Sequence, residues 1–462
     1  MKYSEFIANK LATQQSSGFV VQESQLHPDL LPHQRDLVQI ALKVGRYCIW
    51  ADTGLGKAFM GLEWAKHVAS ETSKPVLIVA PLGVAHQIAE IEAQKFGYTA
   101  KFIETQEDIK DGINVTNYEK LEKFDLSVFG GVVLDESSIL KAKDGKTRQF
   151  IIDAFSETPY KLACSATPAP NDHMELGNQC EFVGALSMNE MLAEYFIHDG
   201  AETQKWRLKG HAQDRFWEFV SSWASYISNP AQLGYDGSAY ELPPINYHEY
   251  LVGEWDELAG NGELLRHQAT GLKEQRQVRK KSMIERCSQA LEIINQNPDT
   301  PWLIWCETNE ESKWIADNVP GIIEVKGADS DRHKKDALLG FARGDIQRLV
   351  TKPKIAGFGM NWQRCHNVIY IGLSHSFEQY YQSIRRVYRF GQDKPVNVHI
   401  IQHVLEGAIV ANIRRKEKQA AELADQLTQK LMLDRAGTFD RTEYNPKMKM
   451  HLPVFLENIV RI

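Results

Sequence analysis

The sequence lacks paired cysteines, long apolar runs and a signal-like beginning. Its six cysteines are scattered, without a CxxC pair or the spacing typical of a zinc site. This pattern argues against a disulfide scaffold or a structural zinc and favours reduced thiols inside a cell. The longest apolar stretches, such as residues 75–85, run for about ten residues and are too short to span a bilayer. Since residues 1–5 also lack the apolar run of a signal peptide, we expect a cytoplasmic protein without a membrane partner.

The chain also lacks an excess of positive charge. Lysine and arginine together number 53 and aspartate and glutamate 60, which gives a net charge of −7. A uniformly basic coat for nucleic acid is thereby excluded, and any site for a polyanion must be a local groove. At roughly 150 residues per domain the length of the chain predicts about two to four domains. An aromatic content of 10% argues against a disordered chain.

Short β-branched runs alternate with amphipathic stretches in two blocks of the chain. Buried strands are predicted at residues 76–80, 132–134, 303–305 and 368–371. Because strands and helices alternate, the pattern indicates a parallel α/β architecture. Between the blocks, apolar residues at helical spacing predict a helix; they are Phe216, Phe219, Val220, Trp223 and Ile227. Pro243 and Pro244 mark the expected linker.

A glycine-rich segment at residues 51–58 follows one apolar run and precedes a helical pattern. Glycines allow backbone N–H groups to approach phosphates, and Lys57 is placed to reach the β- and γ-phosphates. The candidate nucleotide-binding residues in this segment are Thr53, Gly54, Leu55, Gly56, Lys57 and Ala58. Ala58 stands where a Ser or Thr hydroxyl usually ligates Mg²⁺, which weakens the prediction of fast hydrolysis. A tight strand-to-helix turn is the alternative interpretation.

Two carboxylates, Asp135 and Glu136, follow the strand predicted at residues 132–134. Asp135 is the candidate metal residue, which would hold Mg²⁺ through water, and Glu136 would orient or deprotonate the attacking water. A solvated strand end is the alternative for such a pair by itself. Together with the glycine-rich segment, the pair favours hydrolysis of ATP with Mg²⁺.

Two arginines three residues apart, Arg386 and Arg389, belong to the segment at residues 382–392. This spacing places both on one face of a helix, from which they can enter a nucleotide site of the other block and neutralise charge in the transition state. A basic surface helix is the alternative for the segment in isolation. The candidate catalytic residues are thus Lys57, Asp135, Glu136, Arg386 and Arg389.

In this order the segments resemble the superfamily 2 helicase-translocases of the Swi/Snf type, over most of residues 31–420. The resemblance implies two RecA-like parallel-sheet lobes in tandem, a helical insertion and a C-terminal brace helix. It implies an N-terminal segment at 1–29, an ATP-binding lobe at 30–185, the insertion and linker at 186–246, a second lobe at 247–405, and the brace and tail at 406–462. A monomer is expected by analogy with the family.

The resemblance assigns further residues. Gln34 is similar to the glutamine that reads adenine. Residues that couple hydrolysis to contact with a nucleic-acid strand are implied at Pro81, Thr116, Ser165, Thr167, Lys352, Gly357, Gly359, Asn361 and Gln382. The compact size and residues 377–382 look most like members from bacteriophages or prophages, of which one is a branch-migration helicase. The cytoplasm of a host cell is then the expected location.

Double-stranded or branched DNA is the expected partner, contacted mostly through phosphates. One basic run suggests a DNA-binding face, at Lys273, Arg276, Arg279, Lys280, Lys281 and Arg286, with a solvated helix as the alternative. Lys205, Trp206 and Arg207 combine aromatic and basic side chains that can stack on bases, although such a Trp more often anchors a loop to its own domain. Trp217 and Trp223 have the spacing of a core helix.

Three functional hypotheses follow. The first is an ATP-driven translocase on double-stranded DNA that remodels DNA structures, with branch migration in phage replication, recombination or repair as its finer form. The second is a motor that unwinds forks or displaces bound proteins, which the sequence does not separate from the first. The third is an ATP-gated DNA-binding module with little hydrolysis, for which Ala58 is the direct support.

Overall fold

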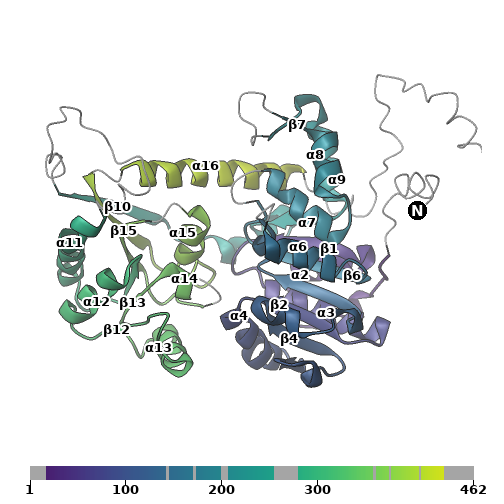
Figure 1. Ribbon diagram of the computed structural model, residues 1–462, viewed down its shortest axis with the longest axis horizontal. Helices are drawn as coiled ribbons and strands as arrows, with labels where there is room; N and C mark the ends of the chain where they lie inside the picture. Colours follow the sequence, from purple (N-terminus) through teal and green to yellow (C-terminus); the bar gives the residue numbers. More distant parts are fainter. Residues whose placement is uncertain are drawn as a thin grey trace, which may run out of the picture.

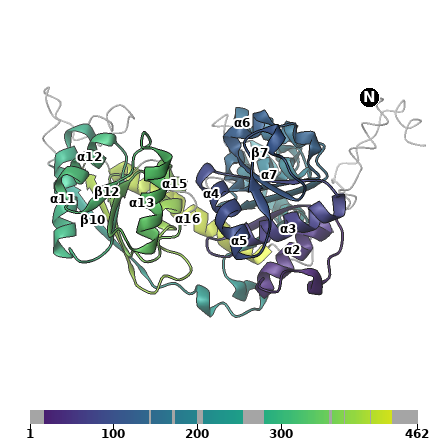
Figure 2. The ribbon, with the colours of Figure 1, turned by 90° about the horizontal axis from the view of Figure 1, so that it is seen from below.

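The computed structural model describes residues 17–141, 145–169, 173–198, 206–253, 279–356, 360–373, 376–404 and 407–430. These residues form two α/β lobes that lie side by side, and one long helix, α16 (Gly407–Lys430), runs across both (Figure 1). Seen from below, the linker joins the lobes on one side and α16 passes behind the gap between them (Figure 2). The predicted pair of parallel-sheet lobes in tandem is confirmed.

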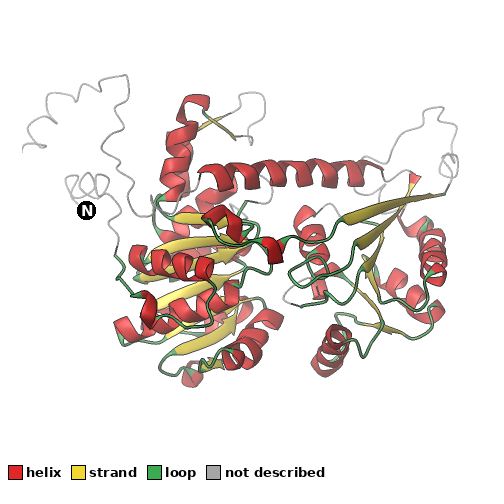
Figure 3. Ribbon diagram, turned by 180° about the vertical axis from the view of Figure 1, so that it is seen from behind, coloured by secondary structure: helices red, strands yellow, loops and turns green. Residues whose placement is uncertain are grey.

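Lobe 1 is built on a seven-stranded sheet in the order β3-β4-β2-β5-β6-β1-β9. All of its neighbouring strands are parallel. Its central strands are buried because they are apolar runs with helices on both faces of the sheet (Figure 3). The strands are β1 (Arg46–Ala51), β2 (Val76–Ala80), β3 (Ala100–Phe102), β4 (Ile113–Asn117), β5 (Gly131–Asp135), β6 (Tyr160–Ser165) and β9 (Ala224–Ile227).

Helices on the two faces of this sheet bury separate apolar clusters. One cluster joins α2 and α3 to the sheet through residues such as Leu37, Met60 and Trp64. The other includes Phe155, which follows α6, and Phe216 from the segment after α7. The lobe 1 helices are α2 (Pro32–Val44), α3 (Lys57–Thr72), α4 (Leu82–Gln87), a π-helix (Ile88–Glu92), α5 (Ala93–Lys95), α6 (Lys146–Ala154) and α7 (Leu176–Val183).

The segment that follows α7 carries two helices and a small hairpin. These are α8 (Met188–Tyr195), α9 (Gln213–Ser221) and the antiparallel pair β7 (Phe196–His198) and β8 (Trp206–Leu208). The helix predicted through Trp223 and Ile227 is wrong in its extent: α9 ends at Ser221, and Ile227 lies on β9, which extends the sheet beside β1. A strand buried on both faces is a continuous apolar run, which helical spacing alone does not distinguish from a helix.

Lobe 2 is built on a six-stranded sheet in the order β10-β15-β14-β11-β13-β12, again parallel throughout. The strands are β10 (Ile245–Val252), β11 (Trp302–Cys306), β12 (Ile322–Glu324), β13 (Arg348–Thr351), β14 (Asn367–Ile371) and β15 (Val396–His403). The helices are α11 (Met283–Gln296), α12 (Asn309–Asn318), α13 (Asp331–Arg343), α14 (Pro353–Ala356) and α15 (Phe377–Ile384). Two apolar clusters, one on each side of the sheet, form its core.

The predicted brace helix is α16, which contacts both lobes. It packs on α9 and β9 of lobe 1 and on α15 of lobe 2. Leu427 is buried in a lobe 1 cluster and Ile413 in a lobe 2 cluster. The linker on the other side holds two short 3₁₀ helices, Pro230–Leu233 and Ser238–Tyr240. None of the helices described for this chain is both long and apolar enough to cross a membrane.

Candidate active site

Three neighbouring strands of lobe 1 end close to lobe 2, whose Tyr381 and Arg385 contact Asp52. We refer to the site between the two lobes as the cleft. In the register of the sheet, Trp50 of β1 pairs with Ser165 of β6, and Asp135 of β5 pairs with Cys164. Because parallel strands present their carboxyl ends at one edge, the glycine-rich segment, the two carboxylates and the Ser165 segment lie next to one another. These segments are far apart in the sequence and meet because β5, β6 and β1 are neighbours in the sheet.

The glycine-rich segment forms a loop that closes onto the N-terminus of α3. Gly54 and Gly56 have positive φ angles of 89° and 83°, which glycine adopts without the strain of a side chain. Lys57 Nζ donates to the Ala51 carbonyl at 2.8 Å and to the Asp52 carbonyl at 3.3 Å. The loop is thus shaped around its lysine, with the first N–H groups of α3 directed toward the cleft.

Gln34, the predicted adenine-reading residue, is buried against this loop. Its Nε2 donates to the Leu55 carbonyl at 3.0 Å and its Oε1 accepts from the Leu31 N–H at 2.9 Å. A Cβ added at Gly56 would lie 2.2 Å from Gln34 Nε2. Gln34 therefore supports the shape of the loop, and its contact with adenine stays a prediction.

The two carboxylates differ in their surroundings. Asp135 is 8% exposed, and burial and then the neighbouring Glu136 raise its pKa, while Lys57 and Arg386 oppose the rise. Glu136 has a φ of 58°, an uncommon conformation for a residue with a side chain, of the kind that clusters at functional sites. Its Oε2 is buried without a hydrogen-bond partner among the described residues. Carboxylates in these surroundings could accept a cation or a polar ligand.

Arg386 and Arg389 of lobe 2 reach the same cleft. Burial lowers the pKa of Arg386 to about 10; Arg389 adds to the effect, and Glu136 and Asp135 counteract it. Burial also lowers the pKa of Arg389, which the Glu92 carboxylate opposes. Arg386 is buried and Arg389 half-buried, and two guanidinium groups close enough to affect each other are stabilised by an anion between them. The five predicted catalytic residues are therefore brought together in one cleft.

Several polar groups in this cleft are buried without partners among the described residues. They are Arg386 Nε, Glu136 Oε2, Thr167 Oγ1 and both amide atoms of Gln382. Buried polar atoms are nearly always hydrogen-bonded, so a cluster of unpaired ones calls for water, an ion or a ligand. A polyphosphate with its cation fits the donors and acceptors present, since the arginines donate and the carboxylates accept.

The predicted coupling residues are placed unevenly. Ser165 Oγ accepts from the Thr167 N–H at 3.0 Å beside the cleft. Thr116 is fully buried and its hydroxyl donates to the Ile103 carbonyl at 3.0 Å, so in this conformation it is not on a surface that DNA can reach. Lys352 Nζ donates to Asn309 Oδ1 at 2.7 Å. Pro81 is half-buried and Asn361 exposed, whereas Gly357 and Gly359 lie outside the described residues.

Gln179 of α7 is a residue that the sequence analysis missed. It is 2% exposed and joins Trp50, Ser137 and Pro168 through its amide group. These partners flank the glycine-rich segment, the carboxylates and the Ser165 segment. No pattern in a single sequence marks such a residue, because its importance comes from three segments that only the fold brings together.

Two of the proposed DNA-contacting groups have structural roles instead. Arg286 of the basic run is fully buried and pairs with Glu311 at 2.8 Å, so its predicted place on a DNA-binding face was wrong. Helical spacing alone does not distinguish an arginine that faces solvent from one that faces the core. Arg279 is half-buried and donates to the Leu373 carbonyl, while Lys280 and Lys281 are exposed. Lys273 and Arg276 lie outside the described residues.

The tryptophans have structural roles in the core of lobe 1. Trp217 and Trp223 are fully buried, and Trp206 packs against the same apolar cluster. Lys205 lies outside the described residues. His33, next to Gln34, is buried with its ring 5.9 Å from that of Tyr240.

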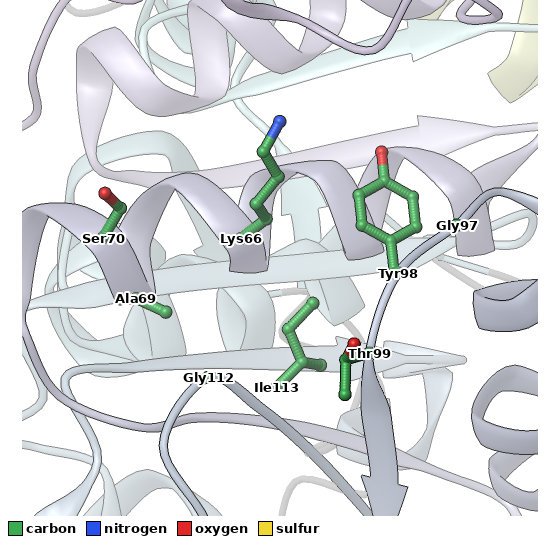
Figure 4. A pocket seen from close by; sticks show the side chains of 8 residues that line it. All are labelled: Lys66, Ala69, Ser70, Gly97, Tyr98, Thr99, Gly112 and Ile113. Atoms are coloured by element: carbon green, nitrogen blue, oxygen red, sulfur yellow. The ribbon is translucent and has the colours of Figure 1, made fainter.

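A hollow of about 420 Å³ lies away from this cleft, in lobe 1. It is lined by the second half of α3, with Lys66 and Ser70, and by the turn that carries Tyr98 and Thr99 (Figure 4). Lys66 follows Lys57 by nine residues of α3, which corresponds to about 14 Å of helix rise. The hollow therefore does not belong to the site that the strand ends form.

Two family models match the chain. Residues 27–170 match a model described as type III restriction enzyme, res subunit, and residues 284–391 match one described as helicase conserved C-terminal domain. Together they span more than half of the sequence and contain the predicted catalytic residues of both lobes. The chain is a helicase whose core consists of these two domains. It is accordingly an enzyme of the DNA-dependent ATPase and helicase class.

Several known proteins are similar to this helicase. Protein p41 of Acyrthosiphon pisum secondary endosymbiont phage 1 is 24% identical, over 85% of this chain and 96% of its own. The ATP-dependent helicase YqhH of Bacillus subtilis is also 24% identical, over 86% of this chain and 81% of its own.

Two further similarities are more limited. A SWI/SNF-related regulator of chromatin, subfamily A-like protein 1, from Xenopus tropicalis is 28% identical over 34% of this chain and 18% of its own. The solved SWI2/SNF2 ATPase core of Sulfolobus solfataricus in complex with dsDNA covers 89% of this helicase and 96% of its own chain, at 20% identity and a TM-score of 0.42.

Proposed function

We propose that the protein is an ATP-driven translocase on double-stranded DNA that remodels DNA structures. The observation that carries the proposal is the composition of the cleft. Asp135 and Glu136 of lobe 1 interact electrostatically with Arg386 of lobe 2, and Asp135 also interacts with Lys57. Buried polar atoms of Glu136, Arg386 and Gln382 have no partner in the described structure. A nucleotide phosphate chain between the lobes would supply the missing partners.

The residues of the cleft divide the work in this proposal. The phosphate loop and Lys57 bind the phosphates from lobe 1, and Glu136 orients the attacking water. Arg386 and Arg389 approach from lobe 2 and neutralise the charge that develops on the phosphate being removed. Because the groups come from two lobes, hydrolysis requires closure, and reopening allows one lobe to step along the DNA.

Mg²⁺ bound with the nucleotide supplies charge neutralisation on the phosphate oxygens. Asp135 is the residue that would hold it, since its carboxylate is buried beside Glu136 and a cation would favour the charged form. No group of three or more His, Cys, Asp or Glu side chains gathers for a metal in the described ranges. The cation would therefore depend on Asp135, water and the nucleotide's own oxygens, the more so because Ala58 offers no hydroxyl.

Branch migration of DNA junctions is the finer form of the proposal. The motif order of a Swi/Snf-type translocase supports movement along duplex DNA, and the similarity to a phage protein over 85% of the chain supports a phage setting. In that setting the enzyme would act in the host cytoplasm, as a monomer, during phage replication, recombination or repair. With a net charge of −7, its DNA contacts must be confined to a local surface.

Displacement of the third strand from a DNA triplex tests the proposal, because it reports movement along an intact duplex. We expect the wild type with ATP and Mg²⁺ to displace the strand and Lys57→Ala to fail. Comparing the triplex with a fork and a four-way junction then separates the forms of motor. Activity on the fork alone would favour conventional unwinding, and preferential activity on the junction would favour branch migration.

An ATP-gated DNA-binding module is the second candidate, and Ala58 is the observation that favours it. Ala58 is half-buried at the start of α3, where it packs against an apolar cluster. Ala58→Thr restores a hydroxyl at the position where it usually ligates the metal. A rise of kcat by several orders of magnitude in this variant would favour the module, whereas little change would mean that the site already compensates.

A further inference from the structure

Arg385 immediately precedes Arg386 but has no part in the roles described above. It caps the C-terminus of α15, and its Nη2 lies 3.1 Å from Asp52 Oδ2 in the phosphate loop of lobe 1. Neighbouring residues of a helix point about 100° apart, so Arg385 and Arg386 serve different groups from one segment. Arg385 thus forms a direct ion pair between the lobes, beside the catalytic cleft.

Tyr381, one helical turn before Arg385, binds the other oxygen of the same carboxylate. Its hydroxyl donates to Asp52 Oδ1 at 3.0 Å. The Arg385 guanidinium lies 4.9 Å from the centre of the Tyr381 ring and 5.5 Å from that of Tyr388. The two rings restrict the guanidinium to the geometry that reaches Asp52. Lobe 2 therefore engages both carboxylate oxygens of one residue in the phosphate loop.

Asp52 is at the same time anchored within the loop. Its Oδ1 accepts from the Thr53 N–H at 2.6 Å, and its carbonyl accepts from Lys57 Nζ at 3.3 Å. Its own N–H donates to the Ile227 carbonyl of β9 at 2.9 Å. A displacement of Asp52 is consequently a displacement of the backbone that holds Lys57.

The ion pair is shielded from solvent. The side chains of Asp52 and Arg385 are 14% and 20% exposed, so the removal of one partner leaves a poorly solvated charge uncompensated. By contrast, another ion pair between the lobes, Lys335 with Glu90 at 3.4 Å, is 65% and 51% exposed. The latter is of the kind that contributes little. The two pairs provide a matched comparison.

We infer that Arg385 and Tyr381 are positioning residues that set the phosphate loop through Asp52 when the lobes are closed. Asp52, Tyr381 and Arg385 constitute an inter-lobe clasp. Opening of the cleft separates α15 from the loop and breaks both contacts to Asp52, so the geometry around Lys57 depends on closure. The inference rests on the proposed function, in which ATP is hydrolysed between the lobes.

Arg385→Gln, Asp52→Asn and the double variant test the clasp in DNA-stimulated ATP hydrolysis. We expect each single variant to lower kcat about tenfold or more, as small misplacements of reacting groups do. KM should change less, by under about threefold, because ATP first binds to lobe 1 in the open cleft. The double variant should be no slower than the slower single variant, because both changes remove one interaction. Arg385→Lys should retain part of the activity, and Lys335→Ala should behave as wild type.

Additive losses in the double variant, or an equal loss in Lys335→Ala, would overturn the clasp. Small-angle scattering with a non-hydrolysable ATP analogue adds a measurement that does not require turnover. Clasp variants should have a larger radius of gyration than the wild type and Lys335→Ala. If the wild type hydrolyses no ATP with any DNA but the clasp variants still open, the proposed function fails and the clasp stands. If hydrolysis and size are both unchanged in the variants, the clasp alone fails.

Discussion

The Ser137 hydroxyl donates a hydrogen bond of 3.0 Å to the side-chain oxygen of Gln179. The same oxygen accepts from Trp50 Nε1 at 2.8 Å, and Gln179 Nε2 donates to the Pro168 carbonyl at 2.8 Å. One buried amide therefore connects the strand before the phosphate loop, the segment after the carboxylates and the segment after Ser165. This connection provides a physical route between nucleotide chemistry and the segment predicted to couple it to DNA.

Gln179→Met removes this connection at similar volume. The three partner groups would remain buried without hydrogen bonds, so we expect the free energy of unfolding to fall by about 2 to 4 kcal/mol. The ratio of DNA-stimulated to basal ATP hydrolysis should fall more than basal hydrolysis does. Urea unfolding and steady-state ATPase assays measure the two effects. Gln94→Met, at an exposed position, is the control, and equal behaviour of both variants would contradict the role of Gln179.

We predict that the backbone conformation of Glu136 lowers the stability of the protein while its carboxylate is required for hydrolysis. Its φ of 58° costs about 1 kcal/mol for a residue with a Cβ and little for glycine. We therefore expect Glu136→Gly and Glu136→Ala both to abolish hydrolysis, with the glycine variant about 1 kcal/mol more stable than the alanine variant. Urea unfolding of the two variants without nucleotide checks this. Equal stabilities would mean that the backbone at this position is not strained.

Gly56→Ala should impair ATP binding. The new Cβ would lie 2.2 Å from Gln34 Nε2, at a φ of 83°, so either the phosphate loop or Gln34 must move. We expect affinity for a fluorescent ATP analogue to fall about tenfold or more, since misplaced N–H groups no longer match the phosphates. Gly83→Ala is the matched control, because a Cβ there meets nothing within 4 Å. Unchanged affinity in Gly56→Ala would show that the loop adapts freely.

The lowered pKa of His399 on β15 predicts that the protein loses stability in mild acid. Burial, and then the neighbouring His248, lower the pKa of His399 to about 4. The unfolded chain therefore binds a proton there at a higher pH than the native protein does, so stability is complete above the unfolded pKa of about 6.5 and declines as the pH falls toward 4. We expect His399 to account for about 1 to 2 kcal/mol of this decline.

The contribution of His399 can be isolated with His399→Gln. Urea unfolding of wild type and variant between pH 7.5 and 4 gives the free energy of unfolding at each pH. The difference between the two proteins should change in this range by the amount predicted for His399. A difference that is independent of pH would show that His399 titrates normally in the native protein.

The fold and much of the site could be predicted from local patterns. Strands such as β2 and β14 are short apolar runs, and their alternation with helices specifies parallel sheets. Lys57, Asp135 and Arg386 stand in segments of the kind that bind phosphates, so the sequence predicted that they share one site, and the structure brings them together. Local patterns were sufficient to predict a structure where the residue types and their spacing are found in few other structural contexts.

Other features depended on contacts between distant segments. The spacing of Arg286 predicted a surface residue, but in the structure Arg286 forms a buried ion pair with Glu311. Gln179 and the Arg385–Asp52 pair bring together segments separated by more than a hundred residues. Ile227 belongs to a strand because β9 pairs with β1 at the edge of the sheet. Such roles are properties of the packing, which periodicity and composition do not encode.

The central claim is that duplex DNA controls hydrolysis in the cleft between the lobes. Steady-state ATP hydrolysis with Mg²⁺ tests it most directly, for wild type and Lys57→Ala, without DNA and with single-stranded, duplex and four-way-junction DNA. We predict strong stimulation of the wild type by duplex or junction DNA and no turnover in Lys57→Ala. Negligible turnover of the wild type under every condition, with DNA binding retained, would contradict the account and make the protein an ATP-gated binder.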